Sequence, residues 1–276
     1  MRKEKTSGMV ELFEQNIRTN ERQSSKGNQL KWENDGIWYK ADYTGYEGLS
    51  EYMISHLFEK STLREAEYVI YDTEQIKYKR NLYHGAKSHT FLKDDWQIMT
   101  LERLFKTVQN ASLNSMLWRI ENLENRLIFL VENVERLTGL RDFGIYINKL
   151  FTLDAFFLNE DRHTHNIAVL MNGEGKFAYC PIFDNGAGLL SDTTMDYPME
   201  EDVYALMQEV RAKTISTDFE EQLDVSEKLY GCNLHFQFTK QDVRNYLERA
   251  EEYPVQIRQR VEKIIFYQMN KYAYLF

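Results

Sequence analysis

A predicted β-hairpin flanked by polar residues sets the strongest limit on the fold of this chain. Two apolar runs, at residues 167–171 and 177–183, are separated by the turn sequence Asn-Gly-Glu-Gly. If the second run folds back antiparallel to the first, the residue before one run and the residue after the other meet at the same open end. Asn166 and Asp184 hold these two positions, so we expect them to lie close together.

The residue types at this open end favour phosphoryl transfer assisted by Mg²⁺. Asp161 lies five residues before Asn166, on the loop that leads into the hairpin. Mg²⁺ prefers a few oxygen ligands from the protein and takes the others from water and nucleotide phosphates. Asn166 and Asp184 can supply those ligands, while Asp161 orients the attacking hydroxyl or accepts its proton. The spacing Asp-x-x-x-x-Asn is also that of the protein-kinase catalytic loop, so we predict ATP and Mg²⁺ as cofactors.

Each of these two motifs, taken alone, also fits an ordinary solvated turn, because short patterns recur by chance. Their order along the chain and the hairpin that joins them reduce the weight of that reading to roughly one in ten. We therefore treat the pair as a candidate catalytic site.

The rest of the chain divides into a β-rich first third and a mainly helical remainder. Asn34-Asp-Gly36, set between apolar residues, predicts a hairpin. Periodicity predicts a helix at 46–60, β-rich runs at 66–71 and 76–84, and further helices at 116–137, 145–158, 240–252 and 255–269. We expect an α+β fold with a small mixed N-terminal lobe, built on an antiparallel sheet at residues 1–95, and a larger helical lobe at residues 96–276.

Composition excludes several classes of protein. The net charge of −9 argues against nucleic acid as a direct ligand, because binding to phosphates needs clustered cations. The two cysteines form no CxxC pair, which argues against a disulfide scaffold or a thiolate zinc site. We find neither a signal peptide nor an apolar run long enough to span a membrane, and we expect a cytoplasmic protein without membrane contact.

The two motifs also resemble those of a known family. Asp161-Arg-His-Thr-His-Asn166, followed by Phe183-Asp-Asn-Gly186, is similar to the catalytic and metal motifs of HipA-like serine/threonine kinases, including the smaller CtkA type. The string Asp-Arg-His-x-x-Asn also occurs in phosphoinositide lipid kinases, to which the HipA fold is distantly similar. The resemblance implies a bilobal protein-kinase-like fold, with Asp161 as the catalytic aspartate and Asn166 and Asp184 as metal ligands.

Two residues within these motifs bear on how the site would work. His163 matches the histidine that has a role in the chemistry of the lipid-kinase relatives, although it can equally hold the loop through a hydrogen bond. Asn185 stands where the kinase motif Asp-Phe-Gly has Phe, so switching through that Phe is not expected here.

A kinase also needs a strand lysine and a helix glutamate that pairs with it. Lys40 ends a predicted strand, and Glu51 lies eleven residues later in the predicted helix. Glu47, one turn earlier, is the competing partner, and we favour Glu51 by the resemblance and by its place beside the buried stripe. We expect the adenine-contacting hinge where the second lobe begins, with Phe91 and Leu92 packing on the base.

The phosphate-covering loop has no standard sequence here. No P-loop string and no Gly-x-Gly-x-x-Gly occurs, which disfavours a P-loop NTPase. The segment at residues 24–28 precedes the lysine strand and can offer backbone N–H groups to phosphate, with Ser25 and Gly27 as the expected contacts. A mobile linker is the alternative. Ser24 and Ser25 would be autophosphorylation sites if this loop covers the phosphates.

Together these features predict a serine/threonine protein kinase that autophosphorylates and acts on a protein substrate. A role in a toxin–antitoxin system, with a small antitoxin-like partner, is an expectation from the family alone, because the chain is too short for the extra N-terminal subdomain of full HipA toxins. The alternatives are a lipid kinase, an AMP-transferring enzyme on the same fold, and a catalytically inactive pseudokinase that serves as an interaction module.

Overall fold

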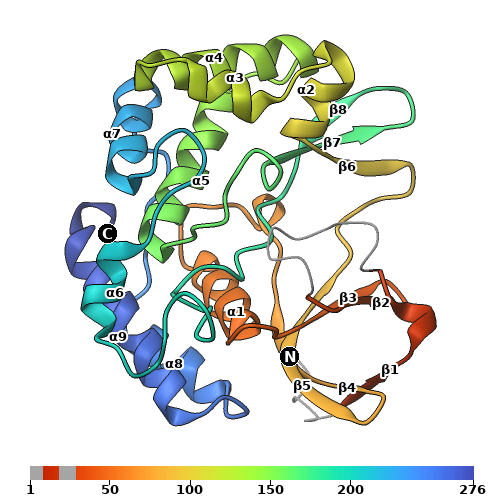
Figure 1. The fold of residues 1–276 in the computed structure, drawn as a ribbon, viewed down its shortest axis with the longest axis vertical. Helices are drawn as coiled ribbons and strands as arrows, with labels where there is room; N and C mark the ends of the chain where they lie inside the picture. The colour runs from red at the N-terminus through yellow and green to blue at the C-terminus, as the bar shows by residue number, and fades with distance from the viewer. Residues whose placement is uncertain (1–8, 19–28) are drawn as a thin grey trace.

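The computed structural model describes residues 9–18 and 29–276 and shows a curled sheet on one side of a mainly helical body (Figure 1). The sheet has five strands, with β1 parallel to β4 and every other pair antiparallel. In their order across the sheet the strands are β1 (Val10–Leu12), β4 (Asp72–Tyr78), β5 (Asn81–His89), β3 (Ile37–Ala41) and β2 (Lys31–Asn34). The predicted α+β class is confirmed.

The β2–β3 hairpin forms at the predicted turn. Asp35 and Gly36 have φ values of 51° and 76°, as a two-residue type I′ turn requires. The register pairs Lys31 with Lys40 across the two strands. Because cross-strand partners lie on the same face of a sheet, both lysine side chains belong to one face.

The two predicted β-rich runs that follow are wrong in detail. The run at 66–71 contains a 3-10 turn, η2 (Glu65–Glu67), and a single bridge from Tyr68 to Ile182. The run at 76–84 crosses the β4–β5 turn, where Lys79 adopts the left-handed region with a φ of 56°. The two central residues of this turn, Lys79 and Arg80, are neither Gly nor Asn, so the usual sequence signal for a hairpin is missing.

Helix α1 (Glu47–Phe58) lies between the sheet and the helical body (Figure 1) and matches the helix predicted at 46–60. Every residue of α1 after Glu47 is buried, so this helix is covered on all sides rather than along one stripe. On the sheet side, a Cβ added to Gly48 would lie 2.4 Å from the carbonyl carbon of Gly85. Only glycine allows the helix to approach β5 so closely.

The helical body surrounds the central helix α5 (Phe143–Phe157), and its core is continuous with the buried faces of α1. The other helices are α2 (Leu101–Gln109), α3 (Leu113–Arg119), α4 (Leu123–Thr138), α6 (Val203–Glu209), α7 (Phe219–Tyr230), α8 (Lys240–Arg249) and α9 (Val255–Lys271), with short 3-10 turns at η1 (Glu14–Asn16) and η3 (Ala273–Leu275). In the described part of the chain, no helix is long and apolar enough to cross a membrane.

The single helix predicted at 116–137 is wrong, because the structure breaks it into α3 and α4. Ile120 is extended, and the side chain of Asn122 accepts a hydrogen bond from the backbone N–H of Asn125 at 2.8 Å, which caps α4. Arg126 holds the break by donating from two nitrogens to the carbonyl of Ile120. A side chain such as Asn competes with the helical backbone in this way and favours a cap over a helix interior.

A second, three-stranded sheet carries the predicted polar hairpin. β6 (Trp96–Thr100) pairs with β7 (Ala168–Asn172), which pairs with β8 (Phe177–Tyr179). β8 is shorter than predicted because Cys180 and Pro181 follow it, and proline has no N–H to donate to a ladder. The chain passes from the first sheet to the second between β5 and β6.

Candidate active site

Lys40 lies at the centre of the site. Its Nζ donates to Oε1 of Glu51 at 2.6 Å and to Oδ1 of Asp184 at 2.5 Å. The predicted pairing of Lys40 with Glu51 is thus present, and the same amine also joins α1 to the motif after β8. The Nζ lies 5.0 Å from the centre of the Tyr71 ring, which covers it on a further side.

Glu47, the competing partner, has a different contact set. Its carboxylate accepts hydrogen bonds from the backbone N–H groups of Tyr43, Thr44 and Gly45 and from the Thr44 hydroxyl, at 2.8–3.2 Å. Glu47 therefore fixes the loop before α1, while Glu51 reaches Lys40. The second carboxylate oxygen of Glu51 accepts a hydrogen bond from the N–H of Asn185 at 2.9 Å.

The three charged groups stabilise one another. Burial opposes the charge on Lys40, but Asp184 and Glu51 outweigh it and hold the pKa of the lysine well above its ordinary value. Burial would also raise the pKa of Asp184, yet Lys40 and then Lys31 hold it below its usual range. Asp184 is therefore a carboxylate near neutral pH, as a metal ligand must be.

The catalytic loop places Asp161 and Asn166 in direct contact. The amide nitrogen of Asn166 donates to the backbone carbonyl and to Oδ2 of Asp161, both at 2.8 Å. Nε2 of His163 lies 3.6 Å from Oδ1 of Asp161, too far for a good hydrogen bond. Burial lowers the pKa of His163, so the imidazole is neutral near pH 7.

Arg162 holds the two motifs together from the inside. It is 3% exposed and pairs with Asp154 of α5 at 3.2 Å. The same guanidinium donates to the carbonyls of Asn166 and Phe183, and to Oδ1 of Asn185 at 2.7 Å. Asn166 and Asp184 are thus brought together as predicted. Asn185, which replaces the usual Phe, is fixed to Arg162 rather than free to swing.

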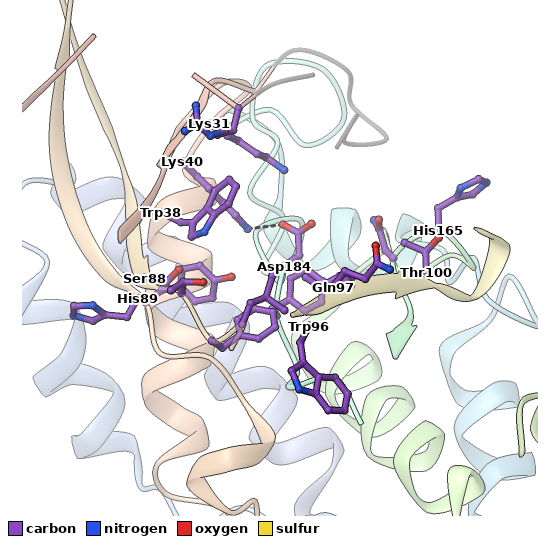
Figure 2. A pocket seen from close by; sticks show the side chains of 18 of the residues that line it. Lys31, Trp38, Lys40, Ser88, His89, Trp96, Gln97, Thr100, His165 and Asp184 are labelled. Carbon is purple, nitrogen blue, oxygen red and sulfur yellow. Dashed lines mark hydrogen bonds and ion pairs between the residues drawn. The ribbon is translucent and has the colours of Figure 1, made fainter. Parts of the chain in front are cut away.

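A cavity of about 440 Å³ opens beside Lys40 and Asp184 (Figure 2). Phe91 and Leu92, both predicted to contact adenine, line it, and Asn166 lines it near Asp184. The ring centres of Phe91 and Phe183 are 5.6 Å apart, which gives this side of the cavity an aromatic surface. Its volume is within the range of small-molecule sites.

Sequence reasoning missed several residues that line this cavity. Trp38 and Lys31 project into it from β3 and β2, as Figure 2 shows, and Arg18 and Arg103 also line it. Alternation along the predicted strand was the available signal, because Trp38 lies two residues before Lys40 and so shares its face. Lys31 could have been assigned to the cavity only from the register of the β2–β3 hairpin, which pairs it with Lys40.

A second, smaller cavity of about 50 Å³ lies on the other side of Asp184 and contains Asp161. Three carboxylates besides Asp161 line it, namely those of Glu47, Glu51 and Asp184. Thus Asp184 borders both cavities, with Asn166 on the larger side and Asp161 on the smaller.

The expected phosphate contacts Ser25 and Gly27, and the proposed modification site Ser24, lie outside the described residues. The roles expected for these three positions therefore stay predictions.

Comparison with known proteins agrees with the arrangement of the lobes. No family model matches the sequence, and no curated protein matches it either. The fold is similar to the crystal structure of the proinflammatory kinase CtkA of Helicobacter pylori, with a TM-score of 0.62 and 14% sequence identity, over 96% of this chain and 95% of that chain. The fold is that of a kinase. At this identity the likeness establishes the CtkA-like bilobal fold and leaves specificity open.

Proposed function

We propose that this kinase-fold protein is an ATP- and Mg²⁺-dependent serine/threonine protein kinase that autophosphorylates. One observation carries the proposal: Lys40 pairs with both Glu51 and Asp184 at the edge of a cavity of nucleotide size. A lysine–glutamate pair beside a metal-binding aspartate is the arrangement that a protein kinase needs for catalysis. A pseudokinase needs none of these charged groups in contact.

The donor atoms near Asp184 suit Mg²⁺. Asp184 supplies an ionised carboxylate, and Asn166 supplies its amide oxygen, because its amide nitrogen is bonded to Asp161. No group of three or more His, Cys, Asp or Glu side chains that could hold a metal occurs among the described residues. A coordination shell with two protein ligands, completed by phosphate oxygens and water, matches the coordination preference of Mg²⁺. Such an ion would neutralise charge on the phosphates.

The remaining residues take separate roles. Lys40 binds the phosphates, and Glu51 fixes its position. Asp161 faces the smaller cavity, where it orients the acceptor hydroxyl and takes its proton. A cavity of about 50 Å³ suits a short side chain such as that of Ser or Thr. Its carboxylates disfavour a phosphorylated lipid head group, which would be repelled.

A role in a toxin–antitoxin system and a small antitoxin-like partner rest on the sequence resemblance alone. The roles of Ser25 and Gly27 as phosphate contacts rest on the place of their segment before the Lys40 strand. They extend the proposal without supporting it.

Intact-mass analysis after incubation with Mg-ATP tests the proposal directly. We expect a gain of one or more phosphates, which Asp161→Ala and Asp184→Ala abolish. Asp224→Ala, an exposed aspartate on α7, is the matched control and should retain the gain. A mass gain equal to AMP would show that the site transfers AMP instead of phosphate. No gain, and no thermal stabilisation by Mg-ATP, would contradict the proposal and favour a pseudokinase.

A further inference from the structure

Asp42 occupies the junction between the strand that carries Lys40 and the helix that carries Glu51. It is the first residue after β3, and its backbone N–H donates to the carbonyl of His84 on β5 at 2.8 Å. Neither its position nor its residue type belongs to the motifs that mark the active site.

The carboxyl group of Asp42 bridges two parts of the chain. Its Oδ1 accepts a hydrogen bond from the backbone N–H of Gly48 at 2.6 Å, and its Oδ2 accepts one from the hydroxyl of Tyr253 at 2.9 Å. Gly48 is the second residue of α1 and lies three residues before Glu51. Asp42 thus fastens the end of the Lys40 strand to the first turn of the Glu51 helix.

Tyr253 brings the helical body to this junction. It lies between α8 and α9 and is 3% exposed. Its ring centre is 5.2 Å from that of His84, and its carbonyl accepts a hydrogen bond from Nε of Arg258 at 3.1 Å. The residues around Asp42 therefore come from both lobes: β3, β5 and α1 belong to the N-terminal lobe, and the α8–α9 segment belongs to the helical lobe.

The electrostatic surroundings of Asp42 favour its neutral form. Burial, and then repulsion by Glu47 of α1, raise the pKa of Asp42 to about 8. Tyr253 is a further titratable group that contacts the carboxyl, while the ring of His84 packs against Tyr253 and Glu252 precedes Tyr253 in the chain. Among the described residues no cation contacts the Asp42 carboxyl, so its ionisation would place a second negative charge near Glu47.

We propose that Asp42 is a positioning residue for phosphoryl transfer, which holds Lys40 and Glu51 in register and links this pair to the helical body through Tyr253. The inference rests on the proposed kinase function. The hydrogen bond from the N–H of Gly48 joins the start of the Glu51 helix to the end of the Lys40 strand, and the one from the hydroxyl of Tyr253 joins this junction to the helical body. A small displacement at such a pair is enough to slow the reaction severely.

The test compares Asp42→Asn, Asp42→Ala and Tyr253→Phe across pH 6.5–9.5, by autophosphorylation rate and by hydrogen exchange of the backbone at residues 43–51. Asn keeps a neutral acceptor for the N–H of Gly48, and its amide group reverses the second hydrogen bond by donating to the Tyr253 oxygen, so it is the conservative variant. Asp35→Asn, in the β2–β3 turn, and the exposed Tyr274→Phe are matched controls.

We expect Ala to lower kcat at least tenfold at pH 7 with less than a threefold change in the KM for ATP, and Phe to lower kcat several-fold. The ratio of the Asn rate to the wild-type rate should rise about fivefold or more between pH 7 and pH 9, as wild-type Asp42 ionises. A merely structural role would not produce this divergence. Parallel pH profiles of the Asn variant and the wild type, or an Ala variant with wild-type kcat and unchanged exchange, would overturn the inference.

Hydrogen exchange separates this inference from the proposed function. If the wild type transfers no phosphate, the kinase proposal fails on its own. Faster exchange at residues 43–51 in the Ala variant, with Asn restoring protection, then supports the bridge, and unchanged exchange in both variants contradicts it.

Discussion

Lys40 forms ion pairs with two carboxylates, and each carboxylate has a second role in the site. Glu51 also accepts from the N–H of Asn185, and Asp184 borders both cavities. Because a buried charge is costly without partners, these ion pairs stabilise the buried amine of Lys40. A nucleotide phosphate that approaches Lys40 therefore meets a fixed cation and competes with Asp184 for it.

We predict that Trp38, which lines the larger cavity, stacks on the nucleobase. Two residues along a strand span about 6.6 Å, and this separation sets an indole ring where the base of a nucleotide held by Lys40 would lie. Stacking of a base on an aromatic ring is worth about 1–3 kcal/mol. We expect Trp38→Ala to weaken binding of Mg-ADP about 10- to 100-fold by calorimetric titration.

Trp118 offers a matched control, because it is 41% exposed on α3 and does not line the cavity. Trp118→Ala should leave the affinity for Mg-ADP unchanged. A Trp38→Ala variant that binds within twofold of the wild type would show that the base lies elsewhere.

Chemistry-bearing residues were the most predictable part of the site. The spacing of Asp161 and Asn166 and the hairpin geometry predicted that Asn166 meets Asp184, and the structure places them around Arg162. Asp42 and Tyr253 were out of reach of the sequence, because 211 residues separate them and no local pattern records a contact of that range. Lys31 needed the hairpin register rather than a motif.

Among the elements, predictions succeeded where a local signal had no competitor. The turn at Asp35 and Gly36, the helix over α1 and the start of α8 at residue 240 follow from short-range chemistry, and all three are present. The α3–α4 break and the β4–β5 turn were missed because a side-chain cap at Asn122 and a left-handed Lys79 override the apolar periodicity. Propensity is a weak prior where such contacts intervene.

The η2 turn, predicted as part of a strand, is fastened to α5 by an ion pair. Glu67 contacts Lys149 at 2.6 Å and Arg64 at 3.1 Å, and its carbonyl accepts from the N–H of Ile182, two residues before Asp184. Burial alone would raise the pKa of Glu67, but Lys149 and Arg64 outweigh it and lower the pKa to about 2.

Glu67→Gln is therefore expected to destabilise the protein by about 1 kcal/mol at pH 7, the upper range for a partly exposed pair. The lowered pKa means that this stability is fully present above the ordinary pKa of 4.5 and is lost as pH falls toward about 2. Urea unfolding at pH 7, 5 and 3.5 should show the difference from the wild type shrinking with acid. Glu65→Gln, exposed in the same turn, is the control, and a Glu67→Gln difference that grew with acid would contradict the assignment.

At the scale of the molecule, a single core joins the two lobes. The main cluster of buried apolar side chains runs from Leu49 and Phe58 of α1 to Phe156 of α5 and Ile264 of α9, while a smaller cluster around Trp32 fills the far face of the sheet. In Figure 1, α1 stands between sheet and helices and is the element that both share. A helix buried on all sides cannot swing without exposing apolar surface, so we infer a site that is assembled before the nucleotide binds.

This shared core predicts one cooperative unfolding transition for the whole chain rather than two. Mg-ATP at about one hundred times its Kd should add about 2.7 kcal/mol of stability, which corresponds to a shift of the transition midpoint by about 5 °C for a chain of this size. Calorimetry with and without nucleotide measures the number of transitions and the shift of the midpoint. Asp184→Ala should keep the single transition and lose most of the shift, because it removes a metal ligand while leaving the core intact. Two resolved transitions, with only one raised by nucleotide, would show that the lobes unfold separately and that α1 does not bind them into one unit.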